Sequence, residues 1–367
     1  MKLDTHTLTQ RIETRRWVAV APLIAILLMV GCQAPRGGGS SPTANAAETN
    51  PLRPRVELET TLGNLVLELD AEASPITVIN FVDYVRDGFY DGITFHRVVE
   101  KTVIQGGGYL PDMTAKTDGL RATIPNEWPN GLVNRRYTIG MVRRPGVANS
   151  ARSEFYINLA HNLHLDEPSD KVGYTVFGKV VDGFDTIEKI RRVPVATHPR
   201  YAEGRSAVVP IKPVVIRTVR LITPFDRAGA KQIVQQYQAE EENRLANLIR
   251  SHEEKAGNQA VTSKSGLIYV DLVVGGGAMP VLESEISILY IGTFVGGVEF
   301  ESRLEEPLTI KLDTAIKGWQ EGLQTMKEGG ERLLIVPSEL GFGSGGIPGM
   351  IPPDSTLVFE ITLLQVD

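Results

Sequence analysis

The sequence is poor in cysteine, in surplus positive charge and in long apolar runs. Its 367 residues contain one cysteine, which excludes intramolecular disulfide bonds and cysteine-rich metal centres. The 38 Lys and Arg residues are outnumbered by 44 Asp and Glu, and the formal net charge of −6 disfavours a nucleic-acid-binding protein. The six histidines are scattered along the chain, so we expect no metal site.

The apolar run near the amino-terminus, Trp17–Val30, is too short for a typical membrane-spanning helix. It covers about 14 residues, whereas about 20 are needed to cross a bilayer. Arg11, Arg15 and Arg16 precede the run and Gly31-Cys32 follows it, which is the order of a secretory signal peptide. We therefore favour a signal peptide at residues 1–32 over a transmembrane anchor.

The residues before the single cysteine resemble a bacterial lipobox. In Met29-Val30-Gly31-Cys32, the residue three before the cysteine is Met rather than the usual Leu. The resemblance implies that Cys32 is acylated, and two acyl chains hold a protein stably at a membrane. Gln33 in place of Asp implies an outer-membrane lipoprotein that faces the periplasm of a Gram-negative bacterium. We expect membrane contact through this lipid anchor only.

Composition divides the rest of the chain into segments. Residues 33–54 are rich in Gly, Ser, Pro, Ala and Asn, which predicts a flexible tether. The hydrophobic fraction of 42% and charged fraction of 22% are typical of globular proteins, and the length suits two domains. We place these domains at residues 55–223 and 263–367, with a connecting segment at 224–262.

The first domain is predicted to be β-rich with two helices. Val56–Thr60 and Leu65–Leu69 alternate apolar and polar residues on either side of a turn, as paired strands do. Ser74-Pro75 predicts the start of a helix with Ser74 as N-cap, and Phe184–Arg191 predicts a second helix. This pattern is compatible with a β-barrel.

The connecting segment is predicted to be helical over residues 224–256. Tyr237 and Leu245 belong to an apolar set at near-helical spacing, and Glu240 and Arg244 form an i,i+4 pair. Two interpretations stay open: a solvated spacer packed lightly on a neighbouring domain, and a dimerisation surface.

The second domain is predicted to be β-rich with one short helix, Gly318–Met326. Five β-type runs surround this helix: Gly266–Val274, Glu285–Phe294, Leu308–Leu312, Glu331–Val336 and Thr356–Val366. No internal repeat links the two domains, so we expect two different folds.

Motifs in the first domain resemble the cyclophilin family. They are Phe95–Val99, Gln105–Gly108, Ile124–Glu127, Ser153–Ile157 and Val176–Val180. The resemblance covers about residues 55–223. It implies a closed β-barrel with two helices and peptidyl-prolyl cis-trans isomerase activity.

Rotation about an X-Pro bond needs no covalent chemistry, but resonance sets a barrier of about 18–20 kcal/mol. A guanidinium that donates to the amide nitrogen stabilises the twisted amide more than the planar one. By resemblance Arg97 has this role and Gln105 holds the substrate backbone, while His96 is interpreted as a packing residue. The resemblance also implies five substrate-binding residues: Val103, Phe155, Tyr156, His164 and Leu165.

Several positions of this pocket depart from the cyclophilin pattern. Thr102 and Val103 stand where Phe and Met are usual, Glu154 stands for Gln, and His164 stands for an aromatic residue. Each lost aromatic removes on the order of 1–3 kcal/mol of apolar contact with proline. We further hypothesise that Glu154 pairs with Arg97 and withdraws it from the substrate. Altered or weakened turnover is therefore expected in this domain.

Motifs in the second domain resemble the FKBP family. Ile316–Gly322 and Gly349–Phe359 agree with that family in spacing, and the resemblance covers about residues 266–367. It implies an antiparallel sheet wrapped on the short helix, with Trp319 and Glu301 as catalytic residues. The implied pocket walls are Tyr290, Phe300, Ile316, Phe342, Ile351 and Phe359.

An aromatic, water-poor cavity suits this reaction because the twisted amide is less polar than the planar one. Glu301 stands where Asp is usual, and Phe342 replaces a Tyr whose hydroxyl bond is worth about 0.5–1.5 kcal/mol. We therefore expect full isomerase activity with weak macrolide binding here, and at most weak cyclosporin binding in the first domain.

The two domains together predict an isomerase that acts on proline-containing exported polypeptides during folding. The alternative is a holdase-type chaperone or binding module that docks such segments without efficient turnover. A third hypothesis is a scaffold that binds envelope proteins, but the sequence contains no extra motif that supports it. Neither family needs a cofactor, so none is expected.

Overall fold

The computed structural model describes residues 50–166, 172–201, 207–347, 350–352 and 354–367. The predicted signal peptide, Cys32 and most of the tether therefore lie outside the described residues. Within the described part of the chain, no helix has both the length and the apolar character needed to cross a membrane.

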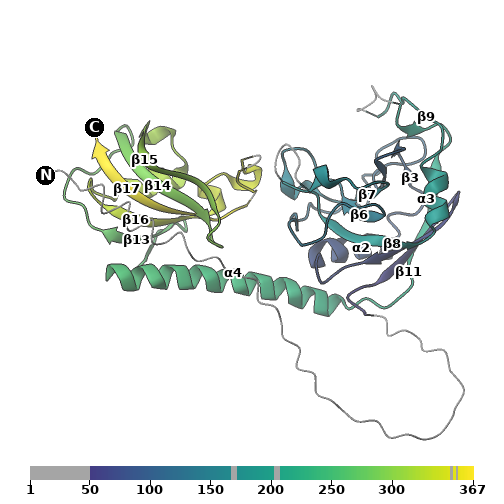
Figure 1. Cartoon of the computed structure of the whole chain (residues 1–367), viewed down its shortest axis with the longest axis horizontal. Helices are drawn as coiled ribbons and strands as arrows, with labels where there is room; N and C mark the ends of the chain where they lie inside the picture. The colour runs from purple at the N-terminus through teal and green to yellow at the C-terminus, as the bar shows by residue number, and fades with distance from the viewer. Residues whose placement is uncertain (1–49, 167–171, 202–206, 348–349, 353) are drawn as a thin grey trace, which may run out of the picture. The chain divides into compact units, whose positions relative to one another are not determined.

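The first domain is a nearly closed antiparallel barrel (Figure 1). Among the described residues, nine strands follow the order β3-β11-β1-β2-β8-β6-β7-β5-β4. Their bounds are β1 Arg55–Thr60, β2 Gly63–Leu69, β3 Thr94–Phe95, β4 Arg97–Val99, β5 Val103–Gly106, β6 Thr138–Met141, β7 Phe155–Asn158, β8 Val176–Asp182 and β11 Val214–Leu221. The two ends of the sheet, β3 and β4, are separated in the chain only by His96, so the barrel almost closes at this residue.

Two helices accompany the barrel, as predicted: α2 (Pro75–Arg86) and α3 (Phe184–Ile190). A short pair of strands, β9 (Val195–Ala196) and β10 (Val209–Pro210), follows α3 in the sequence. Phe81 of α2 reaches the barrel core, where its ring lies 5.7 Å from that of Phe155 and 5.3 Å from that of Phe177. Burial of each such ring stabilises the fold by about 1.5–3 kcal/mol.

The start of α2 is capped differently from the prediction. Ser74 is the N-cap residue, but its hydroxyl donates to the carbonyl of Val176 instead of accepting from the helix. The free N–H groups of Ile76 and Thr77 donate to the two carboxylate oxygens of Glu127, at 2.9 and 2.7 Å. The motif that contains Glu127 therefore has a structural role in this domain.

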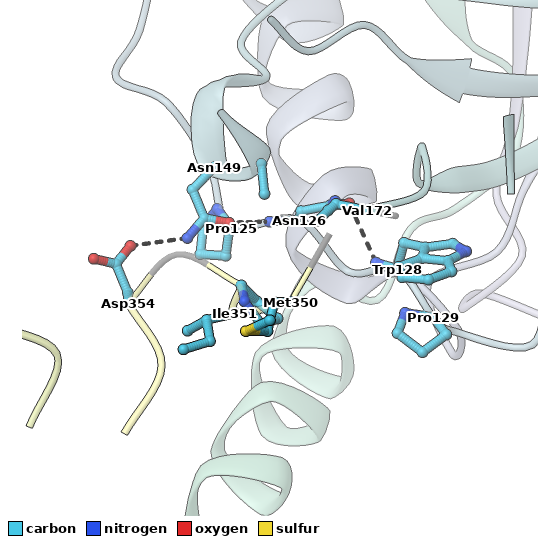
Figure 2. Close-up of a pocket in the computed structure, with 11 residues that line it drawn as sticks. Pro125, Asn126, Trp128, Pro129, Asn149, Val172, Met350, Ile351 and Asp354 are labelled. Atoms are coloured by element: carbon cyan, nitrogen blue, oxygen red, sulfur yellow. Dashed lines mark hydrogen bonds between the residues drawn. The ribbon is translucent and has the colours of Figure 1, made fainter. Parts of the chain in front are cut away.

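The loop that carries Glu127 is itself held by side-chain bonds (Figure 2). Asn126 donates its backbone N–H to Asn149 at 2.8 Å, and its side-chain oxygen accepts the N–H of Trp128 at 3.2 Å. Because these bonds fix the backbone on either side of Glu127, its carboxylate is delivered to α2 in one position.

The connecting helix α4 (Arg227–Ala256) is 30 residues long. Near its start, Arg227 pairs with Asp83 of α2, and Ala230 is buried in the core of the first domain. The predicted Glu240–Arg244 pair is confirmed, with 3.6 Å between the charged atoms.

The last turns of α4 pack on the second domain. Leu245, which the sequence placed in an apolar set, covers a buried cluster together with Leu248 and Ile249. The cluster consists of Val270, Leu333, Ile335 and Val358. Tyr237, midway along the helix, is 55% exposed. This packing agrees with the spacer interpretation, and dimerisation through the exposed part of α4 stays a prediction.

The second domain is an antiparallel sheet that packs on one short helix, as predicted (Figure 1). The strands follow the order β12-β13-β16-β17-β14-β15 within the described residues. Their bounds are β12 Val261–Thr262, β13 Ile268–Val273, β14 Glu285–Phe294, β15 Glu299–Lys311, β16 Glu331–Val336 and β17 Leu357–Val366, and the helix is α5 Lys317–Leu323. Strand β15 begins nine positions before the predicted Leu308, so it includes Phe300 and Glu301.

A buried arginine holds the end of α5 against the sheet. Arg332 of β16 is 1% exposed and forms an ion pair with Asp271 of β13, with 2.6 Å between the charged atoms. The same guanidinium donates to the carbonyl of Gly322 and to the hydroxyl of Thr325, at the carboxyl end of α5. This network fixes the helix that carries Trp319.

Candidate active sites

The first candidate site is built on three neighbouring strands. Arg97 of β4 is directly opposite Gln105 of β5, and Gln105 is directly opposite Tyr156 of β7. Side chains of directly paired residues lie on the same face of a sheet, so this register brings the three together. The structure therefore unites the two predicted catalytic residues, Arg97 and Gln105, with one predicted wall residue.

A row of polar contacts crosses this site. The guanidinium of Arg97 donates to Gln105 Oε1 at 3.5 Å, and Gln105 Nε2 donates to Glu154 Oε2 at 2.8 Å. His96 Nε2 lies 3.4 Å from the same carboxylate oxygen. We hypothesised from the sequence that Glu154 binds Arg97 directly, whereas these contacts place Gln105 between the two.

The environment of Glu154 keeps its carboxylate ionised. Burial acts to raise the pKa of Glu154. The nearby imidazole of His96, together with the hydrogen bond from Gln105, outweighs this effect and holds the pKa of Glu154 below its usual value.

His96 is fully buried beside Glu154. Its ring centroid lies 4.5 Å from that of Tyr109 and 5.7 Å from that of Tyr201. These contacts agree with the interpretation of His96 as a packing residue, and they hold its Nε2 toward Glu154.

Tyr156 is anchored by a residue that the sequence gave no reason to single out. Its hydroxyl donates to Asn134 Oδ1 at 2.6 Å, and Asn134 in turn donates to Asp166 at 2.6 Å. Burial of the phenol, with the tyrosine and aspartate charges nearby, raises the pKa of Tyr156 far above its ordinary value. The hydroxyl therefore stays a neutral donor, and the ring lies against Gly140, where a side chain would clash with it.

The remaining predicted wall residues are placed differently. Phe155 is fully buried in the barrel core because it precedes Tyr156 in β7 and points to the opposite face, so it is not available to a substrate. Val103 of β5 is 5% exposed. His164 is exposed and Leu165 half-buried in the short helical turn Leu163–Leu165.

The second candidate site is a cluster of aromatic rings. The ring centroid of Trp319 lies 5.0 Å from that of Tyr290 and 5.1 Å from that of Phe359. The ring centroids of Phe300 and Phe359 are 5.7 Å apart. All seven apolar residues predicted for this pocket belong to one cluster: Tyr290, Phe300, Ile316, Trp319, Phe342, Ile351 and Phe359. The indole N–H of Trp319 is buried and has no hydrogen-bond partner among the described residues.

Charged groups flank the phenol of this cluster. Burial raises the pKa of Tyr290 to about 12, and the hydrogen bond and negative charge of Glu301 act in the same direction. Arg303, which is directly opposite Tyr290 in the sheet, partly offsets this rise. Arg303 was not predicted from the sequence, although it follows Glu301 by two residues in one strand and therefore lies on the same face.

Gly292 of β14 was also missed. A Cβ atom at this position would lie 2.6 Å from the ring of Phe300 and 3.1 Å from that of Phe359. The absence of a side chain is therefore what allows these rings to cross the strand. Within the described residues, no group of three or more His, Cys, Asp or Glu side chains is arranged to hold a metal ion.

Two family models match separate parts of the chain. Residues 55–221 match the cyclophilin type peptidyl-prolyl cis-trans isomerase/CLD family, and residues 276–364 match the FKBP-type peptidyl-prolyl cis-trans isomerase family.

Named relatives fall into the same two groups. Peptidyl-prolyl cis-trans isomerase A of Dickeya dadantii is 43% identical over 167 residues, which cover 46% of this chain and 84% of the relative. The FK506-binding protein of Neisseria meningitidis serogroup B is 49% identical over 105 residues, which cover 28% of this chain and 96% of the relative. FKBP-type peptidyl-prolyl cis-trans isomerase FkpA of Escherichia coli is 44% identical over 107 residues, which cover 29% of this chain and 39% of the relative.

These matches correspond to the two sites described above, one around Arg97 and Gln105 and one around Trp319. Both families act on proline-containing polypeptides. The chain belongs to the cyclophilin family through its first domain and to the FKBP family through its second, and it is a peptidyl-prolyl cis-trans isomerase.

Proposed function

We propose that the two isomerase domains are unequal and that the FKBP-type domain supplies the larger share of turnover. The observation that carries this proposal is the packing of Tyr290, Trp319 and Phe359 into one ring cluster. A proline that rests on this cluster leaves water behind. The planar amide, which is the more polar form, then loses more stabilisation than the twisted form, so the barrier falls.

The cyclophilin-type domain relies on a different physical effect. Arg97 is half-buried and adjacent to Gln105, so its guanidinium is placed to donate to the pyramidal nitrogen of a twisted prolyl amide. Thr102 and Val103 offer less apolar surface to the proline ring than Phe and Met would. We propose that this domain turns over more slowly because it binds proline less well.

A comparison of single variants of the whole chain tests this inequality. We expect Trp319→Ala to remove more than half of the cis/trans exchange rate on an Ala-Pro peptide, and Arg97→Ala to remove the smaller remainder. Trp319→Phe is the control for folding because it keeps a ring in the cluster. Equal losses from the Trp319→Ala and Arg97→Ala variants would contradict the proposed inequality.

The same variants separate turnover from simple binding of clients. For an isomerase, both variants slow proline-limited refolding of a client protein. For a holdase, they leave that rate unchanged and the chain still suppresses aggregation.

We also propose that Cys32 anchors the protein in the outer membrane, facing the periplasm, where it assists the folding of exported polypeptides. The support is the lipobox-like Met29–Cys32 and the charged and apolar segments before it. Labelling with a radioactive fatty acid should mark the wild-type chain and not Cys32→Ser. Label on Cys32→Ser, or none on the wild type, would contradict the anchor.

Weak macrolide binding by the FKBP-type site completes the proposal. Phe342 lies in the ring cluster without the hydroxyl of the usual Tyr, which costs about 0.5–1.5 kcal/mol of ligand affinity. Restoring it with Phe342→Tyr should tighten macrolide binding by about threefold to tenfold in calorimetry. Unchanged affinity in that variant would contradict this account.

A further inference from the structure

We propose that Glu154 is a positioning residue of the cyclophilin-type site, whose carboxylate sets the orientation of the Gln105 side-chain amide toward Arg97. The inference rests on the isomerase activity of this domain and adds to it a residue that does not touch the substrate. The contacts that carry it are Arg97 to Gln105 Oε1 at 3.5 Å and Gln105 Nε2 to Glu154 Oε2 at 2.8 Å.

The orientation follows from what each group can donate or accept. An ionised carboxylate only accepts hydrogen bonds and a guanidinium only donates them. Gln105 lies between the two, so its N–H₂ must face Glu154 and its oxygen must face Arg97. An apolar side chain at position 154 would leave the Gln105 N–H₂ without this acceptor, and it would permit Gln105 in either of two orientations.

The structure holds Glu154 in place for this role. Its side chain is 33% exposed, and His96 Nε2 lies 3.4 Å from the oxygen that accepts from Gln105. His96 is fixed by the rings of Tyr109 and Tyr201. Gly108 provides the necessary space, since a Cβ atom there would lie 2.7 Å from the carboxylate carbon of Glu154.

The consequence for the reaction is preorganisation. With its amide fixed, Gln105 presents an oxygen to Arg97 at all times, and it retains a second N–H for the substrate backbone. Groups that are already oriented need not reorganise when the amide twists, so the effect belongs to the transition state and to kcat more than to KM.

The test uses the whole chain and subtracts the rate of the Arg97→Ala variant, so that only turnover in the first domain is counted. We expect Glu154→Ala to lower kcat for an Ala-Pro peptide by about tenfold with KM nearly unchanged, since a hydrogen bond to a charged group is lost. Glu154→Asp and Glu154→Gln keep an acceptor oxygen and should lose less. Glu100→Ala makes the same change at an exposed residue between β4 and β5 and should have no effect.

The second readout is the NMR signal of the Gln105 side-chain N–H₂, assigned by its disappearance in Gln105→Ala. In the wild type, one of its protons should be shifted downfield by the carboxylate, and Glu154→Ala should remove this shift. If Glu154→Ala leaves either the signal or kcat unchanged, the positioning role is overturned. If the wild type shows no Arg97-dependent turnover, the isomerase activity assigned to this domain is contradicted. The NMR signal of Gln105 then still shows whether Glu154 orients its amide.

Discussion

The ring of Tyr290 meets the indole of Trp319 edge-on, with centroids 5.0 Å apart and planes inclined at 77°. Tyr290 belongs to β14 and Trp319 to α5, so the contact joins the sheet to the helix that packs on it. Phe359 of β17 contacts both rings. Edge-to-face pairs of this kind add about 0.5–1.5 kcal/mol each beyond their buried area, so the site is also a stable part of the core.

Gly292→Ala should damage the FKBP-type site with little change in the charge or polarity of the pocket. The added methyl group would lie 2.6 Å from the ring of Phe300, which must then move. We expect the part of the exchange rate that Trp319→Ala abolishes to fall at least fivefold, because displaced rings no longer fit proline. Peptide exchange spectroscopy measures this rate.

The matched control is Gly296→Ala in the turn after β14. A Cβ atom at Gly296 has no neighbour within 4 Å, and this glycine lies outside the left-handed region. The control should leave the rate unchanged. An equal loss of exchange rate in both variants would mean that replacing a backbone glycine causes the effect, and not displacement of the rings.

Tyr290→Phe should change how stability depends on alkaline pH. The folded-state pKa of Tyr290 is about 12 against an ordinary value of 10.0, so the folded chain holds this proton more tightly than the unfolded chain does. The stabilisation is fully present below pH 10 and is lost as the pH rises through 12. Tyr290→Phe should therefore lose stability less steeply than the wild type between pH 10 and pH 12.

Urea unfolding at several alkaline pH values measures this slope. It is followed by fluorescence in a Trp17→Phe, Trp128→Phe background, which leaves Trp319 as the one tryptophan of the chain. Tyr237→Phe is the control because Tyr237 is 55% exposed on α4. It should follow the wild-type curve. A Tyr290→Phe curve that runs parallel to the wild type throughout this range would contradict the raised pKa.

Asp271→Ala should destabilise the FKBP-type domain by about 3 kcal/mol, because it leaves the buried charge of Arg332 without its carboxylate. Arg332 also binds Gly322 at the end of α5, so the floor of the site should loosen as well. Urea unfolding gives the stability, monitored by Trp319 fluorescence in the background that lacks the other two tryptophans. Glu240→Ala, which breaks an exposed pair on α4, should cost less than about 1 kcal/mol.

The regular elements could be predicted because they depend on local patterns. The β-type runs Glu285–Phe294 and Glu331–Val336 predicted β14 and β16 with their observed bounds. The helix over residues 224–256 was predicted from spacing and charge pairs and is observed as Arg227–Ala256. In each case the sequence pattern that predicts the element lies within that element.

The missed features depend on contacts between residues far apart in the chain. Asn134 holds Tyr156, and Arg303 faces Tyr290 only because β14 and β15 pair in a particular register. Phe155 was assigned to the pocket because sequence resemblance does not show which face of β7 meets the core. Glu154 was paired with Arg97 by charge alone, whereas the fold places Gln105 between them.

Glu127→Ala should destabilise the cyclophilin-type domain by about 1–2 kcal/mol, since it leaves two N–H groups at the start of α2 without acceptors. Glu127→Gln keeps one acceptor oxygen and should lose about half as much. Urea unfolding followed by far-ultraviolet circular dichroism measures both. The control is Glu72→Ala, which breaks an exposed pair with Arg53 and should be nearly neutral. If Glu127→Ala were equally neutral, Ser74 would have to cap the helix after all, and Ser74→Ala would then become the destabilising variant.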